Sequence, residues 1–322
     1  MKNAKWVVVL LLLFSVTVTY FSVRGSRPIQ NSYAFPKKLS ALQLFAGPMS
    51  LLTPAEGLEV LELSATLFTD HAEKQRLIRL PKGTKLVVKD DGLPLFPEGT
   101  LLAKTFYYPL ANSKRQLIET RILLLKNSKW NAVTYQWNRE QTEAFLITQG
   151  ATVTVNLADD TVINYQIPSA TACTSCHRAG DVLLPIGPKI RNLNRLVMLD
   201  GKQHNQLDVL QAKGLLNNTT ASPKITALPN YNDTGIPLEQ RARAYMDLNC
   251  AHCHNPGGMA GNQTLKLDYA VPFGKSGIAI NKLNIIYRME TKGDFHMPKL
   301  GTTVTDTAGL TLVKNYIKSL NN

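Results

Sequence analysis

The cysteines of this chain fall into two C-x-x-C-H motifs. All 4 are used, in Cys173-Thr174-Ser175-Cys176-His177 and Cys250-Ala251-His252-Cys253-His254. This spacing is typical of covalent c-type haem attachment, in which each thiol adds to one vinyl group and the following His binds the iron. With 4 Cys and 6 His in 322 residues, composition alone gives on the order of 0.001 copies of the pattern. The sequence therefore predicts two covalently attached haems, with His177 and His254 as their proximal iron ligands.

Three other uses of cysteine pairs fit the pattern less well. A redox-active dithiol does not need the trailing His. A four-cysteine zinc site prefers about 15–20 residues between its pairs, whereas 73 residues separate Cys176 from Cys250. A disulfide across a two-residue loop would be strained and reducible. Haem attachment is therefore the favoured interpretation.

Methionine is the commonest distal ligand in small cytochromes c, and it raises the reduction potential relative to His. Met297-Pro298 follows His254 by 43 residues and precedes the last expected helix. We therefore expect Met297 to bind the second iron, with the adjacent His296 as its competitor and with Met259 and Met289 as weaker candidates. His252, between the two cysteines, is expected to face solvent or a haem propionate.

The distal ligand of the first iron stays open. Met198 and His204 are the nearest downstream candidates, at 21 and 27 residues from His177. If neither binds, the sixth coordination position of this iron is vacant. The stretch 184–188 is expected to wrap the proximal side, where a proline carbonyl would accept the Nδ1 proton of His177 and fix the ring.

The N-terminus predicts export. Lys2 and Lys5 precede an uncharged, largely apolar run from Trp6 to Val23. Residues 1–25 are therefore expected to be a signal peptide or a single N-terminal membrane anchor that sends the rest to the periplasm. This agrees with the cysteines, because c-type haem is attached outside the bacterial cytoplasmic membrane.

The chain is basic, with a net charge of +13. Removing residues 1–24, which hold three cations and no acid, leaves +10. Such a charge suits an acidic redox partner or an anionic membrane surface. No nucleic-acid-binding motif is present.

Two regions of different composition are expected, giving an α+β fold. Residues 36–168 hold short β-type runs separated by turn residues, which predicts an antiparallel, sandwich-like domain. The expected strands are 84–89, 100–108, 116–126, 132–137, 143–148, 152–156 and 161–166.

Residues 169–322 are expected to form a mainly α, loop-rich, dihaem domain. Pro237 opens a predicted helix over 238–249, which runs into the second motif. Apolar residues at helical spacing between Leu310 and Leu320 predict a closing helix. The order helix, C-x-x-C-H, Met-Pro and helix resembles class I cytochrome c.

Further stretches carry a resemblance over residues 36–320. They are 67–70, 72–74, Arg76, 104–106, 119–121, Trp130, 135–138, 193–195, 205–207, 241–245, 249–254 and 297–298. On these the chain resembles an uncharacterised bacterial family of exported dihaem c-type cytochromes with a β-rich N-terminal region. The resemblance implies a periplasmic dihaem protein and no more, because the activity of that family is not established.

Electron transfer between redox partners is the leading functional hypothesis, since no general base or nucleophile stands out. A dihaem peroxidase or MauG-like oxidase, with an open first haem fed by the second, is the alternative enzyme hypothesis. A third hypothesis makes the β-rich region a binding module for a protein or polysaccharide. The sequence leaves the choice between enzyme and carrier open.

Overall fold

A computed structural model describes residues 33–110, 115–157, 161–217 and 224–320. These residues belong to one compact unit of mixed α and β structure. The expected signal or anchor over residues 1–25 lies outside the described residues. Within the described residues, no helix is long and apolar enough to span a bilayer.

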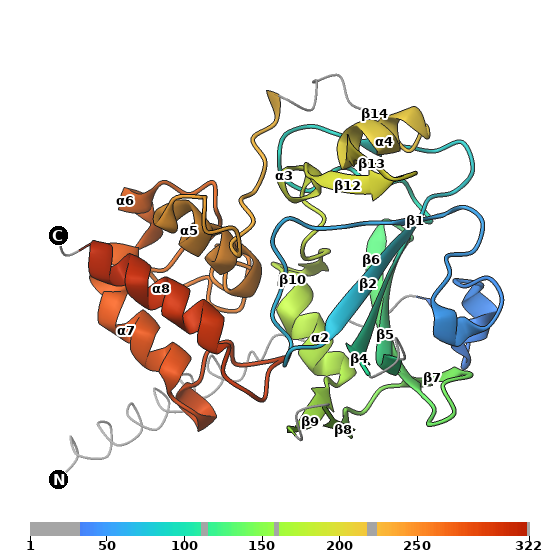
Figure 1. Cartoon of the computed structure of the whole chain (residues 1–322), viewed down its shortest axis with the longest axis horizontal. Coiled ribbons are helices and arrows are strands. Elements are labelled where there is room, and N and C mark those ends of the chain that lie inside the picture. Colours follow the sequence, from blue (N-terminus) through green and yellow to red (C-terminus); the bar gives the residue numbers. More distant parts are fainter. Residues whose placement is uncertain (1–32, 111–114, 158–160, 218–223, 321–322) are drawn as a thin grey trace, which may run out of the picture. The chain divides into compact units, whose positions relative to one another are not determined.

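A six-stranded antiparallel sheet is the largest element (Figure 1). Its strand order is β1-β2-β4-β5-β6-β7, so neighbours in the sheet are mostly neighbours in the sequence. The strands are β1 (Leu58–Val60), β2 (Glu73–Arg79), β4 (Leu101–Pro109), β5 (Arg115–Lys126), β6 (Lys129–Trp137) and β7 (Ala144–Ile147).

Each face of the sheet has its own cover, because side chains alternate along a strand. One face, with Leu101 and Ala103 of β4, packs against the N-terminal segment that holds the short 3₁₀ helices η1 (Leu39–Leu42) and η2 (Met49–Leu51). The other face, with Phe106 and Tyr108, packs against the separate hairpin of β8 (Ala151–Asn156) and β9 (Val162–Ile167). The sandwich-like arrangement expected from the sequence is thus one large sheet faced by a hairpin.

Small elements complete the connections around the sheet. They are α2 (Ala170–His177), β10 (Arg178–Ala179), β11 (Val182–Leu183), α3 (Ile190–Leu193), the hairpin β12 (Leu196–Leu199) and β13 (Lys202–Asn205), α4 (Gln206–Ala212), and β14 (Leu216–Asn217), which pairs with β3 (Leu86–Val87). A third apolar cluster joins α3 and α4 to Ile78 of the sheet.

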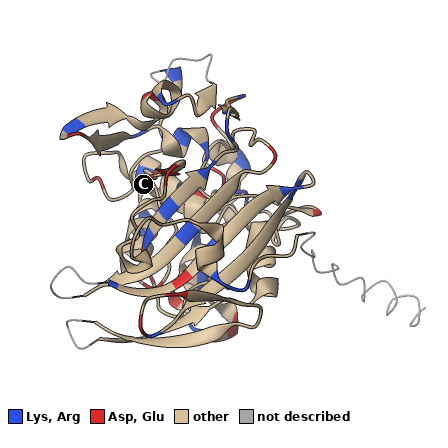
Figure 2. Ribbon diagram, turned by 90° about the vertical axis from the view of Figure 1, so that its right-hand side faces the viewer, with Lys and Arg blue, Asp and Glu red and all other residues tan. Residues whose placement is uncertain are grey.

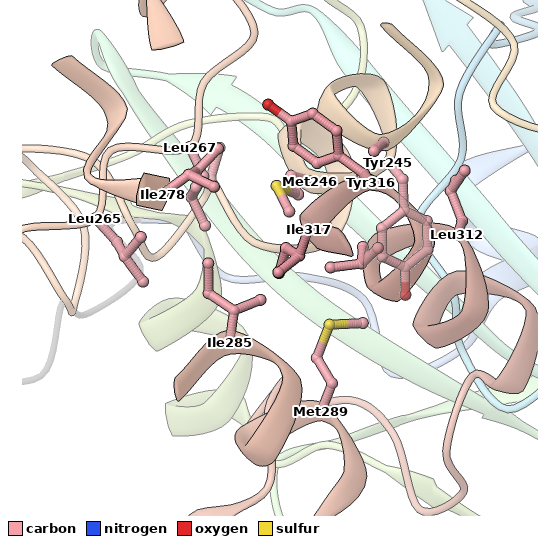
Figure 3. Packing of buried hydrophobic residues seen from close by; sticks show 13 residues of the cluster. Tyr245, Met246, Leu265, Leu267, Ile278, Ile285, Met289, Leu312, Tyr316 and Ile317 are labelled. Atoms are coloured by element: carbon pink, nitrogen blue, oxygen red, sulfur yellow. The ribbon is translucent and has the colours of Figure 1, made fainter. Parts of the chain in front are cut away.

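Helices dominate the C-terminal part. They are α5 (Leu238–Asn249), α6 (Phe273–Ser276), α7 (Ile278–Glu290), the 3₁₀ turn η5 (Gly293–Phe295) and α8 (Thr307–Ser319). Apolar side chains of α5, α7 and α8 meet in one cluster (Figure 3), where Ile285 and Met289 of α7 point toward Leu312 and Ile317 of α8.

The contact of α5 with α8 depends on one glycine. Gly309 of α8 lies against the ring of Tyr245, and a Cβ at position 309 would lie 2.3 Å from the Tyr245 Oη. The Asp306 carboxylate caps α8 by accepting the Gly309 N–H at 2.8 Å, and its other oxygen accepts the Tyr245 hydroxyl at 3.0 Å. The same acid therefore starts α8 and positions the ring that α8 packs against.

Hydrogen bonds cross the expected boundary at residues 168 and 169. The Asp70 carboxylate, from the loop before β2, accepts the Thr303 N–H at 2.8 Å and the Thr303 hydroxyl at 2.8 Å. The Asn249 side chain accepts the Phe68 N–H at 2.7 Å. The segment before β2 thus holds both the end of α5 and the loop between Met297 and α8.

Candidate functional site

The first C-x-x-C-H motif forms the second half of α2. The Ser169 hydroxyl caps this helix by accepting the Ala172 N–H at 3.3 Å, and the helix ends at His177. Cys173 and Cys176 are both reduced and partly buried. The Cys173 Sγ lies 3.8 Å from the Thr134 Oγ1 of β6, so the motif rests directly on the sheet (Figure 1).

The His177 ring is fixed by the backbone of the segment that follows it. Its Nδ1 lies 2.8 Å from the Leu184 carbonyl oxygen, and the Leu184 N–H donates to the His177 carbonyl at 2.8 Å. The acceptor expected within 184–188 is therefore the residue before Pro185, rather than a proline. Burial and the nearby Lys104 lower the pKa of His177 to about 3, so Nε2 is unprotonated at neutral pH and free to bind a metal.

His177 lines a cavity against the sheet. The motif side contributes His177, Pro185, Ile186 and Pro188. The remaining lining is Leu61, Leu63, Arg76, Leu77, Leu102, Ala103, Lys104, Arg121 and Leu123.

Three cations cross the sheet in register within this cavity. Arg76 of β2 pairs with Lys104 of β4, which pairs with Arg121 of β5. Figure 2 shows basic positions side by side on neighbouring strands of the sheet. Like charges directly opposite one another destabilise a sheet, so this row suits an anionic occupant. The row continues to Thr134 of β6, the residue that contacts Cys173.

The buried carboxylate of Glu119 pairs with Arg121 at one end of the row. It accepts two hydrogen bonds from Arg121, at 2.5 and 2.9 Å, and one from the Tyr165 hydroxyl at 2.6 Å. Burial acts to lower the pKa of Arg121, and the Glu119 charge raises it above its ordinary value. Burial, reinforced by Arg121 and Arg76, lowers the pKa of Lys104 to about 7.

The second motif follows α5 in a compact turn. The Cys253 and His254 N–H groups both donate to the Cys250 carbonyl, at 3.1 and 2.9 Å. Burial raises the pKa of Cys250 to about 12, so this thiol is neutral. The His254 Nδ1 is buried and makes no hydrogen bond within the described residues, and burial lowers the pKa of this imidazole.

The candidate distal ligands for the second motif lie in different places. His296, Met297 and Met289 line one small cavity, together with Phe68 and Tyr245. The Met297 N–H donates to the Arg288 carbonyl at 2.8 Å. The His296 Nδ1 lies 2.8 Å from the Thr291 carbonyl, which leaves its Nε2 available. Met259 is 56% exposed, away from the helical core.

The candidate distal ligands for the first motif lie outside its cavity. Met198 and His204 belong to the β12–β13 hairpin, and both are exposed, Met198 by 64%. Neither lines the cavity that contains His177. Lys104 and Arg76, which no sequence motif marks as ligands, do line it.

The two motifs are neighbours. The Gly180 N–H, just after the first motif, donates to the Gly257 carbonyl, just after the second, at 2.7 Å. A Cβ at Gly257 would lie 3.1 Å from the Gly180 nitrogen, so the two backbones need this glycine to approach. His252 is partly buried, and burial lowers its pKa to about 4.

A lysine also ties the segment after the first motif to the second. The Lys189 ammonium donates to both oxygens of the buried Asp247, at 2.8 and 3.1 Å, and to Asp268 at 2.7 Å. Asp247 lies on α5, three residues before Cys250. This ion pair therefore fixes the end of α5 from which the second motif begins.

The donor sets at both motifs are compatible with c-type haem. Each offers two reduced thiols and an imidazole whose burial favours the neutral form. The first adds a cavity and a carbonyl acceptor on Nδ1, and the second leaves its Nδ1 without a partner. No group of three or more His, Cys, Asp or Glu residues in metal-binding geometry occurs within the described ranges.

Comparison with protein-family models, with curated proteins and with solved structures gives no match for this chain.

Proposed function

We propose that this chain is an exported, periplasmic dihaem c-type cytochrome of the bacterial family that its sequence resembles, and that it transfers electrons between redox partners. Cys173, Cys176 and His177 would hold one haem, and Cys250, Cys253 and His254 the other. Each haem would supply an iron that gains and loses one electron.

The adjacency of the two motifs is the observation that carries this proposal. The Gly180–Gly257 hydrogen bond brings the two C-x-x-C-H turns together, although 73 residues separate Cys176 from Cys250. Two redox groups held close together in a rigid frame are what electron relay within one chain requires. A pair of independent structural haems would not need that contact.

The surrounding residues would position and tune each group. The Leu184 carbonyl orients His177 through Nδ1, as hydrogen-bond acceptors do for metal-bound imidazoles. Arg76 and Arg121 would neutralise haem propionates. Met297 remains our proposed distal ligand of the second haem, with His296 as its competitor.

The protein surface offers features for a partner. Ile280, Leu283 and Tyr287 on α7 are 78%, 84% and 56% exposed, and they follow one another at helical spacing. Exposed apolar groups of this kind are typical of interaction surfaces. We propose an acidic protein or an anionic membrane surface as the partner, since the chain carries a charge of +13.

Intact-mass spectrometry of the protein expressed with the haem-attachment machinery tests the proposal. The wild-type chain should carry two haems, and the C173A/C176A and C250A/C253A variants one each. Reversible, two-step optical redox titration should accompany the two-haem mass. A wild-type mass without covalent haem would refute the proposal.

An oxidase or peroxidase activity is the second candidate. The observation that favours it is the cationic cavity at His177, because guanidinium and ammonium groups there would attract an anionic substrate. Mixing the reduced, two-haem protein with hydrogen peroxide decides between the two. Rapid turnover would favour the enzyme, and inertness the electron carrier.

A further inference from the structure

The cavity at His177 has two walls of different chemistry. The motif and the segment after it form one wall, in which His177 is the polar member. The sheet forms the facing wall, where Lys104 lies between Arg76 and Arg121 on three adjacent strands. A group bound to His177 in this cavity would therefore share the cavity with the middle of the cationic row.

Few atoms lining this cavity are able to bind iron. Most lining side chains are Leu, Ile, Ala or Pro and carry no donor atom. The guanidinium groups of Arg76 and Arg121 stay protonated and have no lone pair to offer. Apart from His177 itself, Lys104 is the one lining side chain whose nitrogen gains a lone pair when it releases a proton.

The surroundings of Lys104 leave its nitrogen uncommitted. Within the described residues, the Lys104 Nζ makes no hydrogen bond or ion pair, and it lies 5.1 Å from the centroid of the Phe106 ring. Glu119, the buried acid nearby, already binds Arg121 and the Tyr165 hydroxyl. Burial, and then the positive charges of Arg121 and Arg76 directly opposite, lower the pKa of Lys104 and so favour its neutral amine.

We propose that the Lys104 Nζ is the second axial ligand of the haem that His177 binds. This inference rests on the proposed function, because it needs a haem at Cys173 and Cys176. It fills the position for which the sequence offered Met198, His204 or a vacancy, and it gives the first iron two nitrogen ligands. A closed first iron also favours the electron carrier over the peroxidase.

A measurement on the unmodified chain tests this directly. In the ferric protein labelled with ¹³C-lysine, the side chain of an iron-bound lysine should give hyperfine-shifted NMR signals far outside the normal range. Absence of any such signal from the two-haem protein would overturn the inference. So would a resting first haem that is high-spin and binds cyanide or carbon monoxide at once.

Substitutions of Lys104 distinguish a role of its side chain as an iron ligand from a role of its charge. In K104A and K104R, one of the two haems should change from low-spin to high-spin by EPR and optical spectra, because neither side chain binds iron. Added methylamine should restore the low-spin signal in K104A. The matched control is K74A, which removes a neighbouring lysine that lies 6.0 Å from the same Phe106 ring but is not among the residues lining the cavity.

The outcomes of these tests are distinguishable. A low-spin first haem in both K104A and K104R would refute lysine ligation and leave the dihaem proposal intact. An intact mass without haem at Cys173 and Cys176 would refute the proposed function itself. Should K104A fail to fold, K104R keeps the cation and the lysine NMR signal needs no variant at all.

Discussion

The two C-x-x-C-H motifs share a sequence pattern and differ in nearly everything around it. The first rests on a sheet, and its cavity is lined by three cations in register. The second follows α5 and lies beside an apolar core made by α5, α7 and α8 (Figure 3). In the first, Nδ1 of the histidine has a carbonyl acceptor, and in the second it has no partner within the described residues.

This difference shows that the fold can place one sequence pattern in two different environments. Charge near a haem and the nature of its axial ligand both shift its reduction potential. A haem in the cationic first region, with two nitrogen ligands, and one in the apolar second region, with a methionine ligand, would have different potentials. Two groups of different potential at these neighbouring motifs would make a directional relay.

Removing Glu119 should have the largest effect, and it should be confined to the first region. In E119Q, Arg121 loses its buried counter-charge beside Lys104 and Arg76, so we expect a loss of about 3–5 kcal/mol of unfolding free energy. Chemical denaturation measures the loss. Amide hydrogen exchange should accelerate in β4 and β5 more than in α5 and α8.

A surface carboxylate provides the control for E119Q. Glu290 pairs with Lys314, and both are exposed, by 42% and 34%, so E290Q should cost about 0–1 kcal/mol. The double variant E119L/R121M removes both buried charges and should recover much of the stability that E119Q loses. Equal losses in E119Q and E290Q would contradict the view that the cationic row depends on Glu119.

The sequence predicted the parts whose signals are local. Pro237 and the apolar spacing placed α5 at Leu238–Asn249, as observed. The alternation in 100–108 and 116–126 predicted β4 and β5 within one residue at each end. β2 was missed because its sequence, Glu-Lys-Gln-Arg-Leu-Ile-Arg, places charges where a core strand has apolar residues. Helix α7 was missed because Ile280, Leu283 and Tyr287 are exposed and blur its amphipathic period.

The cysteine and histidine positions of the candidate site follow from a local pattern, whereas its surroundings do not. Cysteine spacing shows where thiols and imidazoles stand in the chain. Arg76, Lys104 and Arg121 are far apart in the sequence, and only the register of three strands brings them together. Likewise, no local sequence pattern predicts that the Asp70 carboxylate accepts hydrogen bonds from the loop after Met297. The boundary expected between residues 168 and 169 follows a change in composition. Hydrogen bonds nevertheless connect the regions on its two sides.

Substitution of Lys189 should affect both regions, and its loss of unfolding free energy should be the second largest. In K189M the buried Asp247 keeps its charge without its partner, so we expect a loss of about 3 kcal/mol at neutral pH. Burial raises the pKa of Asp247, and the Lys189 charge partly offsets this rise. Removal of the Lys189 charge should therefore raise the pKa of Asp247 further. Protonation of Asp247 then relieves the cost, and the loss should shrink as the pH falls toward 4.

Denaturation of K189M and wild type at pH 8 and at pH 4 checks this sign. The matched control is K213M, which removes an exposed partner of Glu59 and should cost under about 1 kcal/mol at either pH. A K189M loss that grows on acidification would show that Asp247 is not the group left uncompensated. Exchange should quicken both near α3 and at the end of α5.

Substitution of Gly309 should give a smaller effect, confined to the second region. The Cβ of G309A would lie within 2.4 Å of two ring carbons and the hydroxyl oxygen of Tyr245, which is closer than van der Waals contact allows. Either α8 moves away from α5 or the ring turns and breaks its hydrogen bond to Asp306. We expect a loss of about 1–3 kcal/mol, as for other overpacked cores, read as a lower melting temperature.

Gly274 provides the matched control for this last variant. It is also helical, in α6, and a Cβ there would meet nothing within 4 Å, so G274A should leave the melting temperature nearly unchanged. If G309A acts through α5, exchange at Ala242–Asn249 should quicken while β4 and β5 keep the wild-type rate. Faster exchange in the sheet as well would mean that the two regions unfold together, through links such as Lys189 and Asp70. In that case the environments of the two motifs would differ in chemistry while sharing one cooperative fold.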